Sequence, residues 1–448
     1  MWSKTKFNFT YAQLSALAFF AIIIIGAVLL SLPISSRSGE FTPFINALFT
    51  STSATCVTGL VVYDTYSHYS VFGQIVILAL IQIGGLGFMI IATMFLLVLH
   101  KRIGIRERGL LKESISGIQI GGVVRLTKHV LIGTFLLEGI GAIILSVKFS
   151  LEMGILPGIF NGVFHSVSAF CNAGFDLMGR YSEYSSLTRY SSDIIINLVI
   201  MTLIVLGGIG FVVWEDIYRN KFKFEKYQLH SKIVIFTTAL LILCSAIAFY
   251  VLERNNLLAN VGIQEAVLSS TFQAITPRTA GFNTIDIASL SEGSMLLTML
   301  LMLIGGSPGS TAGGIKTTTL VVAILTVISS VKQSDELNIF GRRLEDNILK
   351  RAYSVITIYI FAVLLATLLI SLSQPELMLS NIAFEVLSAI GTVGMSTGIT
   401  SQLIWTSKLI IITLMFCGRV GSLAVIMAVA SNKNSAHVKN PVEKIIIG

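Results

Sequence analysis

Residues 49–60 read FTSTSATCVTGL, and three further segments of the chain follow the same pattern. The other three are FHSVSAFCNAGF at 164–175, TFQAITPRTAGF at 271–282 and FEVLSAIGTVGM at 384–395. Aligned without gaps, each segment places one glycine before a large apolar residue: Gly59, Gly174, Gly281 and Gly394. Neighbouring glycines are roughly 110 residues apart, and a match at such regular spacing predicts a fourfold internal repeat.

Each segment lies between two long apolar runs. The runs before the four segments cover about 14–32, 130–147, 233–251 and 355–372. The runs after them cover about 72–99, 194–214, 295–329 and 409–430. A helix needs about 20 apolar residues to cross a bilayer, so these runs predict eight spans.

The second run of each pair carries a glycine motif, with a glycine pair in the first three repeats and Gly418-Arg419 in the fourth. The four versions are IGGLGF at 83–88, LGGIGF at 206–211, IGGSPGST at 304–311 and CGRVGS at 417–422. The segment between the two runs is too short and too polar to cross, and residues 49–56 are long enough for only about two helical turns. Non-helical backbone at membrane depth must line water or be buried in protein. Each repeat is therefore predicted as span, re-entrant segment and glycine-interrupted span.

The composition excludes a soluble protein. The chain has 448 residues, of which 54% are hydrophobic and 12% charged, against about 25% charged in an average soluble protein. A membrane-embedded enzyme would need paired carboxylates, a histidine cluster or an activated nucleophile, and the six histidines are scattered. The chain is therefore predicted not to be an enzyme.

Basic residues set the predicted orientation. Of the 31 Lys and Arg, 22 lie in the two termini and in the loops at 100–128, 215–232 and 331–351, six lie on the opposite side and three at membrane depth. Basic residues are enriched on the cytoplasmic side, so both termini are predicted inside and all four re-entrant segments outside. This topology also accounts for the net charge of +8 without nucleic acid as a partner.

The predicted fold is an all-α integral membrane protein with four parallel span–pore-loop–span repeats around a central ion pore. It has eight transmembrane helices and four re-entrant pore helices. The repeats are assigned to residues 1–110, 111–225, 226–345 and 346–448, the last including the C-terminal tail.

The four glycines suggest an ion filter. Rings of backbone carbonyls can replace the water shell of K⁺, and glycine tolerates the backbone conformation that such rings need. The alternative is that small residues merely allow close helix packing, which does not explain the fourfold register. The predicted filter comprises each glycine and the three residues before it: Cys56, Val57, Thr58, Gly59; Cys171, Asn172, Ala173, Gly174; Arg278, Thr279, Ala280, Gly281; Gly391, Thr392, Val393, Gly394.

These motifs resemble the Trk/Ktr/HKT superfamily of potassium transporters, with TCVTGL, FCNAGF, TPRTAGF, GTVGM and residues 304–319 (IGGSPGSTAGGIKTTT) as the most specific matches. The length and the eight spans look like the Ktr-type membrane subunit. The resemblance implies K⁺ uptake through the filter, with Na⁺ as a second ion and no cofactor. In the family, serine in place of the first filter glycine accompanies sodium preference, so Gly59 favours potassium. A Na⁺-coupled K⁺ symporter and a Na⁺-preferring transporter on the same fold remain alternatives.

The third repeat breaks its second span at residues 305–314, because five glycines and a proline in ten residues cannot hold a helix. The resemblance implies an intramembrane gate below the filter, with Lys316 after the loop and Arg419 contacting it. Arg419 occupies the position of Gly85, Gly208 and Gly306, and a buried charge needs a partner. A latch on the gate is the favoured role of Arg419, and purely structural pairing is the alternative. The predicted gate residues are Gly305, Gly306, Ser307, Pro308, Gly309, Ser310, Thr311, Ala312, Gly313, Gly314, Lys316 and Arg419.

Other polar residues lie at membrane depth or near the mouth of the pore. Arg278 and Glu385 are predicted to pair and brace adjacent filter segments. Glu138 fits interhelical hydrogen bonding as well as function. For Asn172, His165 and Asp64, local hydrogen bonding is favoured over a specific ion site.

The resemblance also implies partners and a location. It implies a homodimer with one pore per protomer, with residues 445–448 reaching into the interface, in a bacterial cell membrane. A cytosolic ring of nucleotide-binding regulatory subunits would dock on the basic loops. Plain positive-inside bias explains those loops equally well.

Overall fold

The structure is a computed structural model, and it describes residues 11–87, 90, 123–221, 223–333, 337–345 and 347–421. Within these ranges the chain is helical apart from one antiparallel hairpin, β1–β2. The predicted segments at 91–99, 422–430 and 445–448 lie outside the described residues. The elements are α1 (Tyr11–Ser31), η1 (Pro33–Ser35), α2 (Phe44–Thr55), α3 (Thr65–His68), α4 (Val71–Leu86), α7 (Val123–Met153), α8 (Ile155–Phe170), η2 (Met178–Arg180), η3 (Thr188–Tyr190), α9 (Ile194–Gly208), α10 (Phe211–Asn220), η4 (Phe224–Lys226), α11 (Leu229–Glu253), α12 (Ile263–Ile275), η5 (Ile287–Ser289), α13 (Glu292–Leu303), α14 (Thr317–Val331), β1 (Asn338–Ile339), β2 (Arg342–Arg343), α15 (Asn347–Ser373), α16 (Leu379–Gly391), η6 (Thr400–Gln402) and α17 (Trp405–Val420).

Four helices of the described residues are long and apolar enough to cross a membrane: Gln13–Ser31, Val124–Met153, Leu229–Glu253 and Ile348–Ser373. They correspond to the first span predicted in each repeat. At most a third of each apolar window is buried inside the protein, so most of its surface faces outward. On α15 this outward surface includes Phe361, Leu364 and Leu372, which suits contact with lipid.

The second run of the second repeat is interrupted within its glycine motif, and in the first and fourth repeats the described helix ends within that motif. The helix α4 ends at Leu86, α9 and α10 are bent by 97° and α17 ends at Val420. Gly87, Gly210 and Gly421 adopt φ values of 81°, 96° and 96° at these breaks, a conformation that glycine takes without steric penalty. Continuous spans are therefore absent from the described parts of these runs, and α9 plus α10 makes a fifth span only if the bent pair is counted as one.

The third repeat is interrupted differently. Its second run is divided into α13 and α14, and residues 304–316 between them form the segment called here the glycine-rich loop. Ile304 and Ile315 at the two ends of the loop form an isolated parallel bridge, so the chain leaves and re-enters the run at nearly the same point.

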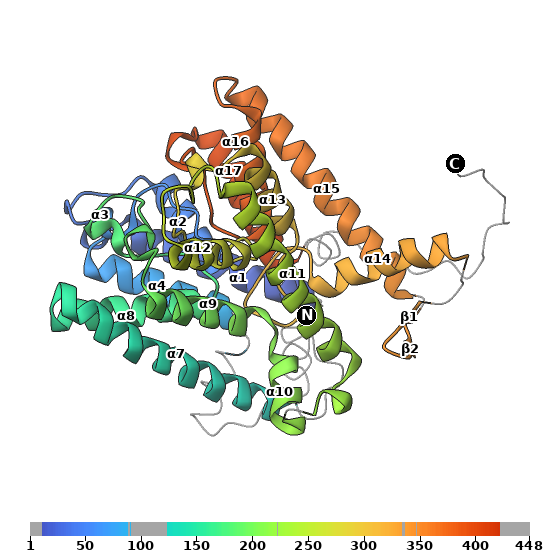
Figure 1. The fold of residues 1–448 in the computed structure, drawn as a ribbon. Coiled ribbons are helices and arrows are strands. Elements are labelled where there is room, and N and C mark those ends of the chain that lie inside the picture. Colours follow the sequence, from blue (N-terminus) through green and yellow to red (C-terminus); the bar gives the residue numbers. More distant parts are fainter. Residues whose placement is uncertain are drawn as a thin grey trace, which may run out of the picture.

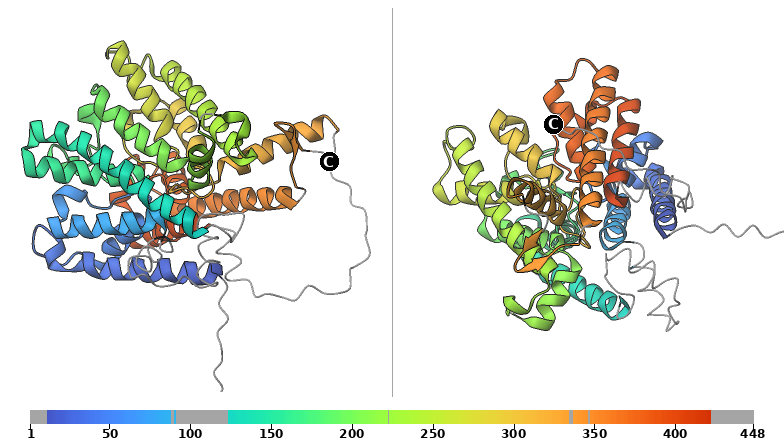
Figure 2. Two further views of the ribbon diagram at one scale, coloured as in Figure 1. Left: turned by 90° about the horizontal axis from the view of Figure 1, so that it is seen from below. Right: turned by 90° about the vertical axis from the view of Figure 1, so that its right-hand side faces the viewer.

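The helices surround the four repeated segments (Figures 1 and 2). The helices α7 and α8 pack along each other, and α14, β1–β2 and the adjoining end of α15 project from the body at one end. The larger apolar cluster lies among α1, α2, α4, α8 and α9, and a second one lies among α1, α2, α15, α16 and α17. Both clusters pack against the ends of the short helices. The repeated glycines follow shortly after those ends.

Candidate functional site

The four repeated glycines meet in one closed ring, called here the glycine ring. A Cβ on Gly59 would lie 2.5 Å from the carbonyl oxygen of Ala173, and one on Gly174 would lie 2.7 Å from that of Ala280. Gly281 meets the carbonyl of Val393 in the same way, and Gly394 meets that of Thr58. Each glycine thus abuts the carbonyl that precedes the glycine of the next repeat, and the fourth contact closes the circle.

The backbone before each glycine repeats an unusual conformation. The residue two positions earlier has positive φ in all four repeats, with 57° at Val57, 59° at Asn172, 80° at Thr279 and 52° at Thr392. Positive φ is rare for residues with a Cβ and a true outlier for Val and Thr. Each ring glycine also has positive φ, so the same pair of unusual backbone positions recurs in all four segments. Such strain recurring fourfold indicates a function for the carbonyls of these segments.

A short helix leads into each of these segments, namely α2, α8, α12 and α16. The helix α2 has 12 residues, longer than the two turns expected at 49–56. A helix C-terminus carries a partial negative charge, so four C-termini beside the ring favour a cation there.

Hydroxyl groups at the helix ends fix the segments, and sequence reasoning missed them. Ser53 Oγ accepts a hydrogen bond from the amide of Gly59 at 3.0 Å, and Ser388 Oγ accepts one from Gly394 at 3.1 Å. Ser168 and Thr276 instead donate to the carbonyls of Phe175 and Phe282, both at 2.7 Å. A small hydroxyl six residues before the glycine, or five in the third repeat, is the signal that could have identified these anchors.

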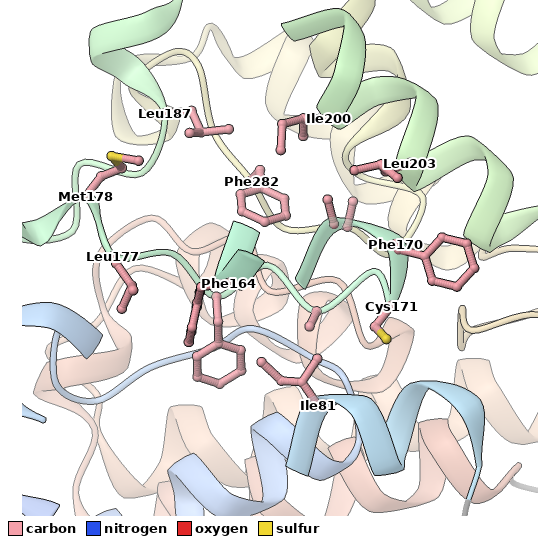
Figure 3. Packing of buried hydrophobic residues seen from close by; sticks show 14 of the residues in the cluster. Ile81, Phe164, Phe170, Cys171, Leu177, Met178, Leu187, Ile200, Leu203 and Phe282 are labelled. Atoms are coloured by element: carbon pink, nitrogen blue, oxygen red, sulfur yellow. The ribbon is translucent and has the colours of Figure 1, made fainter. Parts of the chain in front are cut away.

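The predicted filter residues are buried around this ring. Cys56, Cys171, Ala173, Ala280, Thr58, Val393 and Thr392 are among those with almost no exposed surface. Figure 3 shows Phe164, Phe170 and Cys171 within the apolar packing of the second repeat, with Ile81 of α4 nearby. Phe282, directly after Gly281, enters the same cluster beside Leu187, so the second and third segments share one support.

A cavity of about 400 Å³ opens on the other side of the ring from the glycine-rich loop. All four ring glycines line it, together with Asp64, Asp176 and Asp286. Asp64 accepts hydrogen bonds from the amides of Tyr66, Ser67 and Tyr184, which agrees with the local role favoured from the sequence. Burial, together with the neighbouring charge of Asp64, raises the pKa of Asp176 to about 7, although hydrogen bonds from Met178 and Ser186 act in the opposite direction.

The glycine-rich loop crosses beneath the ring from the second repeat to the fourth. On one side, Ser307 N and Thr311 N donate to the carbonyls of Gly208 and Gly207 at 3.0 and 3.2 Å. On the other, Gly313 lies so close to Thr392 that a Cβ there would collide with its hydroxyl. The loop therefore lies across the inner side of the glycine ring.

Arg419 lies against this loop. Its guanidinium donates to the carbonyls of Thr311 in the loop and of Gly84 and Gly85 in α4, the last at 3.0 Å. Three backbone carbonyls therefore partner this half-buried cation. Its role as a latch stays a prediction.

Lys316 folds back onto the loop that it follows. Its Nζ donates to the carbonyls of Ala312 at 2.7 Å and of Gly313 at 3.3 Å. With Arg419 on Thr311, two cations therefore hold three successive loop carbonyls.

The predicted pair of Arg278 and Glu385 is wrong. Arg278 reaches back to Thr238 of α11 with a hydrogen bond at 3.5 Å, and Glu385 accepts one from the Thr400 hydroxyl. Neither Arg278 Nε nor Glu385 Oε2 has a hydrogen-bond partner among the described residues. The charges are separated because each side chain turns toward hydroxyl groups of its own repeat.

The two remaining polar candidates have local partners. Gln82 Nε2 donates to both carboxylate oxygens of Glu138 at 3.1 and 3.2 Å, which ties α4 to α7. Both ring nitrogens of His165 are occupied, by the carbonyl of Asn161 at 2.8 Å and the amide of Leu177 at 3.4 Å. These contacts fit the interhelical and local roles considered for the two residues.

Comparisons with known proteins agree with this geometry. The family described as "TrkH: Cation transport protein" matches residues 5–439. The potassium/sodium uptake protein NtpJ of Enterococcus hirae is 40% identical, and the match covers 100% of this chain and 99% of that protein. The Ktr system potassium uptake protein B of Bacillus subtilis is 41% identical, over 98% of this chain and 97% of that protein.

A solved structure has a similar fold. The potassium transporter TrkH from Vibrio parahaemolyticus superposes with a TM-score of 0.73, covering 96% of this chain and 87% of that chain. The sequence identity is 18%, so this likeness concerns the fold alone.

Proposed function

Because the chain belongs to the TrkH family of cation transport proteins, we propose that it is the ion-translocating subunit of a potassium uptake system whose filter is the glycine ring. The family is one of transporters and not of enzymes. Both relatives compared above are named for potassium uptake. The proposed path leads inward from the 400 Å³ cavity, through the ring and past the glycine-rich loop.

The closed fourfold contact of glycines and carbonyls is the observation that carries this proposal. A K⁺ ion in a narrow passage needs oxygen ligands in place of water, and backbone carbonyls supply them without a fixed charge. Each segment begins at a helix C-terminus, which adds partial negative charge. Positive φ recurs at each glycine and two residues before it in all four segments. The proposed filter therefore has several rings of carbonyls, one above another.

The proposed architecture has eight spans and four re-entrant pore helices, with repeats at 1–110, 111–225, 226–345 and 346–448. The four long apolar helices and the interruptions of the second run in the second and third repeats support it. Both termini are proposed to be cytoplasmic, on the basis of the basic loops.

The proposed gate is the glycine-rich loop with Lys316 and Arg419. Its support is its position across the inner side of the ring and the two cations bonded to its carbonyls. A loop held by a few hydrogen bonds, without its own helix, can move between two positions at modest cost.

Sodium is a second candidate ion. One relative at 40% identity is named a potassium/sodium uptake protein, which supports Na⁺ as a transported or coupled ion. The other relative is named as part of a "Ktr system", which supports further components. We propose a cytosolic nucleotide-binding ring as that component, and a homodimer of this chain.

Ion flux into proteoliposomes tests the filter. Wild-type protein should take up K⁺ in preference to Na⁺, and Gly281→Ser should abolish that preference, because a side chain there would strike the Val393 carbonyl. Gly39→Ser is the matched control, since Gly39 also has positive φ (71°) but has no atom within 4 Å of its Cβ position. Sodium flux in the wild type that Gly281→Ser leaves unchanged would contradict the filter.

A further inference from the structure

Thr311 connects the glycine-rich loop to the filter segment of the second repeat. Its hydroxyl accepts a hydrogen bond from Nδ2 of Asn172 at 2.9 Å and donates to the carbonyl of Phe170 at 3.2 Å. Its amide donates to Gly207, and Arg419 donates to its carbonyl. The two hydroxyl contacts are buried, and the one to Asn172 joins residues that are 139 positions apart.

Asn172 belongs to the strained part of its filter segment. It has a φ of 59°, two residues before Gly174, and only 1% of its surface is exposed. A non-glycine residue in this conformation costs about 1–3 kcal/mol and persists only if its surroundings hold it. The backbone amide of Asn172 donates to the carbonyl of Ala169 at 3.1 Å, and its side chain is also bonded to the loop.

The other repeats lack this bond at the corresponding position. Val57 has no polar group there, and the hydroxyls of Thr279 and Thr392 have no hydrogen-bond partner in the described part of the chain. Thr392 touches the loop at Gly313 only by packing. The second repeat is therefore the one whose filter backbone depends on a hydrogen bond from the loop.

From this geometry we infer that Asn172 and Thr311 are specificity-determining residues, whose hydrogen bond stays formed while ions pass and sets how well the filter discriminates K⁺ from Na⁺. The inference rests on the proposed function. The bond holds Asn172, and the carbonyls next to it keep the spacing that replaces water around K⁺. Without the bond, the amide loses its partner, the segment relaxes and the smaller Na⁺ is coordinated nearly as well.

Thr311→Val tests the bond at nearly constant side-chain volume. Because a typical hydrogen bond changes an equilibrium by roughly fivefold, the K⁺/Na⁺ flux ratio should fall about fivefold in this variant. Asn172→Ala should lower the ratio by a similar factor. The double variant should fall no further than either single variant, because both remove the same contact.

Ser310→Ala is the matched control. Ser310 Oγ donates to the carbonyl of Ser307 at 2.7 Å and accepts from the amide of Ala312 at 3.2 Å, so its removal loosens the loop without touching the filter. It should change total flux and keep the wild-type ratio. Monodispersity and thermal midpoint in detergent identify any variant that fails to fold, and Thr311→Val then carries the test if Asn172→Ala is lost.

The outcomes separate the two proposals. A wild-type protein that carries no selective K⁺ flux would refute the proposed function itself. Selective wild-type flux, with Thr311→Val keeping the ratio of Ser310→Ala, would refute only the inference. A fall in the ratio that is fully additive in the double variant would also refute it, because the two residues would then act separately.

Discussion

The third repeat differs from the other three directly beneath the glycine ring. In the first, second and fourth repeats, Gly84, Gly207 and Gly418 abut the carbonyls of Thr55, Phe170 and Ile390, at or next to the end of the short helix. In the third, Gly305 abuts the carbonyl of Gly313 in its own loop. Three repeats therefore pack span against short helix without a gap, while the third inserts a loop at the same level.

This difference separates the rigid part of the site from the part that can move. A backbone-to-backbone contact through glycine leaves no room for rearrangement, since interiors are packed as densely as organic crystals. The loop is held instead by individual hydrogen bonds and by two cations, which can be exchanged. Fourfold symmetry at the ring with one asymmetric repeat beneath it suits a constant filter above a movable gate.

The largest expected effect comes from breaking the tight packing. Gly207→Ala should reduce K⁺ flux more than tenfold or prevent folding, because the new methyl group would collide with the Phe170 carbonyl. Gly208→Ala is the matched control in the same helix, since its nearest neighbour, Asn172 Nδ2, would be 3.6 Å away. Flux and thermal midpoint should stay within the wild-type range in the control. Equal losses in the two variants would mean that the loss of flux comes from replacing a helical glycine, and not from the packing against the short helix.

A smaller effect is expected when the glycine-rich loop is released from Arg419. Arg419→Gln removes the cation that joins Thr311 to Gly84 and Gly85, so uptake at limiting K⁺ should rise by roughly tenfold. Arg419→Lys keeps the charge but not the forked geometry that reaches several carbonyls at once, and it should give an intermediate rate. Normal protein yield with wild-type uptake in both variants would contradict the latch.

The parts predictable from sequence were those with a local or periodic pattern. The apolar runs identified the four long helices, and the fourfold spacing identified the glycines that meet in the ring. The glycine motifs marked where the described second-run helices break or end, at Gly87, Gly210 and Gly421, because glycine adopts positive φ without steric penalty.

Contacts between distant side chains could not be predicted. Arg278 and Glu385 were paired on charge alone, whereas burial beside hydroxyl groups provided each with other partners. Asn172 was expected to bond locally, yet its partner is Thr311 in another repeat. Such contacts depend on how the repeats pack around the ring, and spacing along the chain carries no information about that.

The smallest predicted effect concerns the outer mouth of the ring, where the second repeat differs from the other three. Asp176 follows Gly174 by two residues, and the corresponding positions hold Val61, Asn283 and Ser396. With a pKa of about 7, the Asp176 carboxyl is mostly neutral at pH 6 and mostly charged at pH 8. A carboxylate at the mouth attracts cations, so the K⁺ concentration for half-maximal uptake should fall about threefold over this range.

Asp176→Asn should remove this pH dependence and keep the half-saturating concentration near the wild-type value at pH 6. The neighbouring Asp64 accepts three amide hydrogen bonds, and Asp286 lies at the exposed edge of the cavity, so the asparagine variant isolates one carboxyl. Proteoliposome uptake with only the external pH varied measures the effect. If the variant keeps the wild-type pH dependence, the titrating group is not Asp176. The difference between repeats that controls uptake then lies entirely on the loop side of the glycine ring.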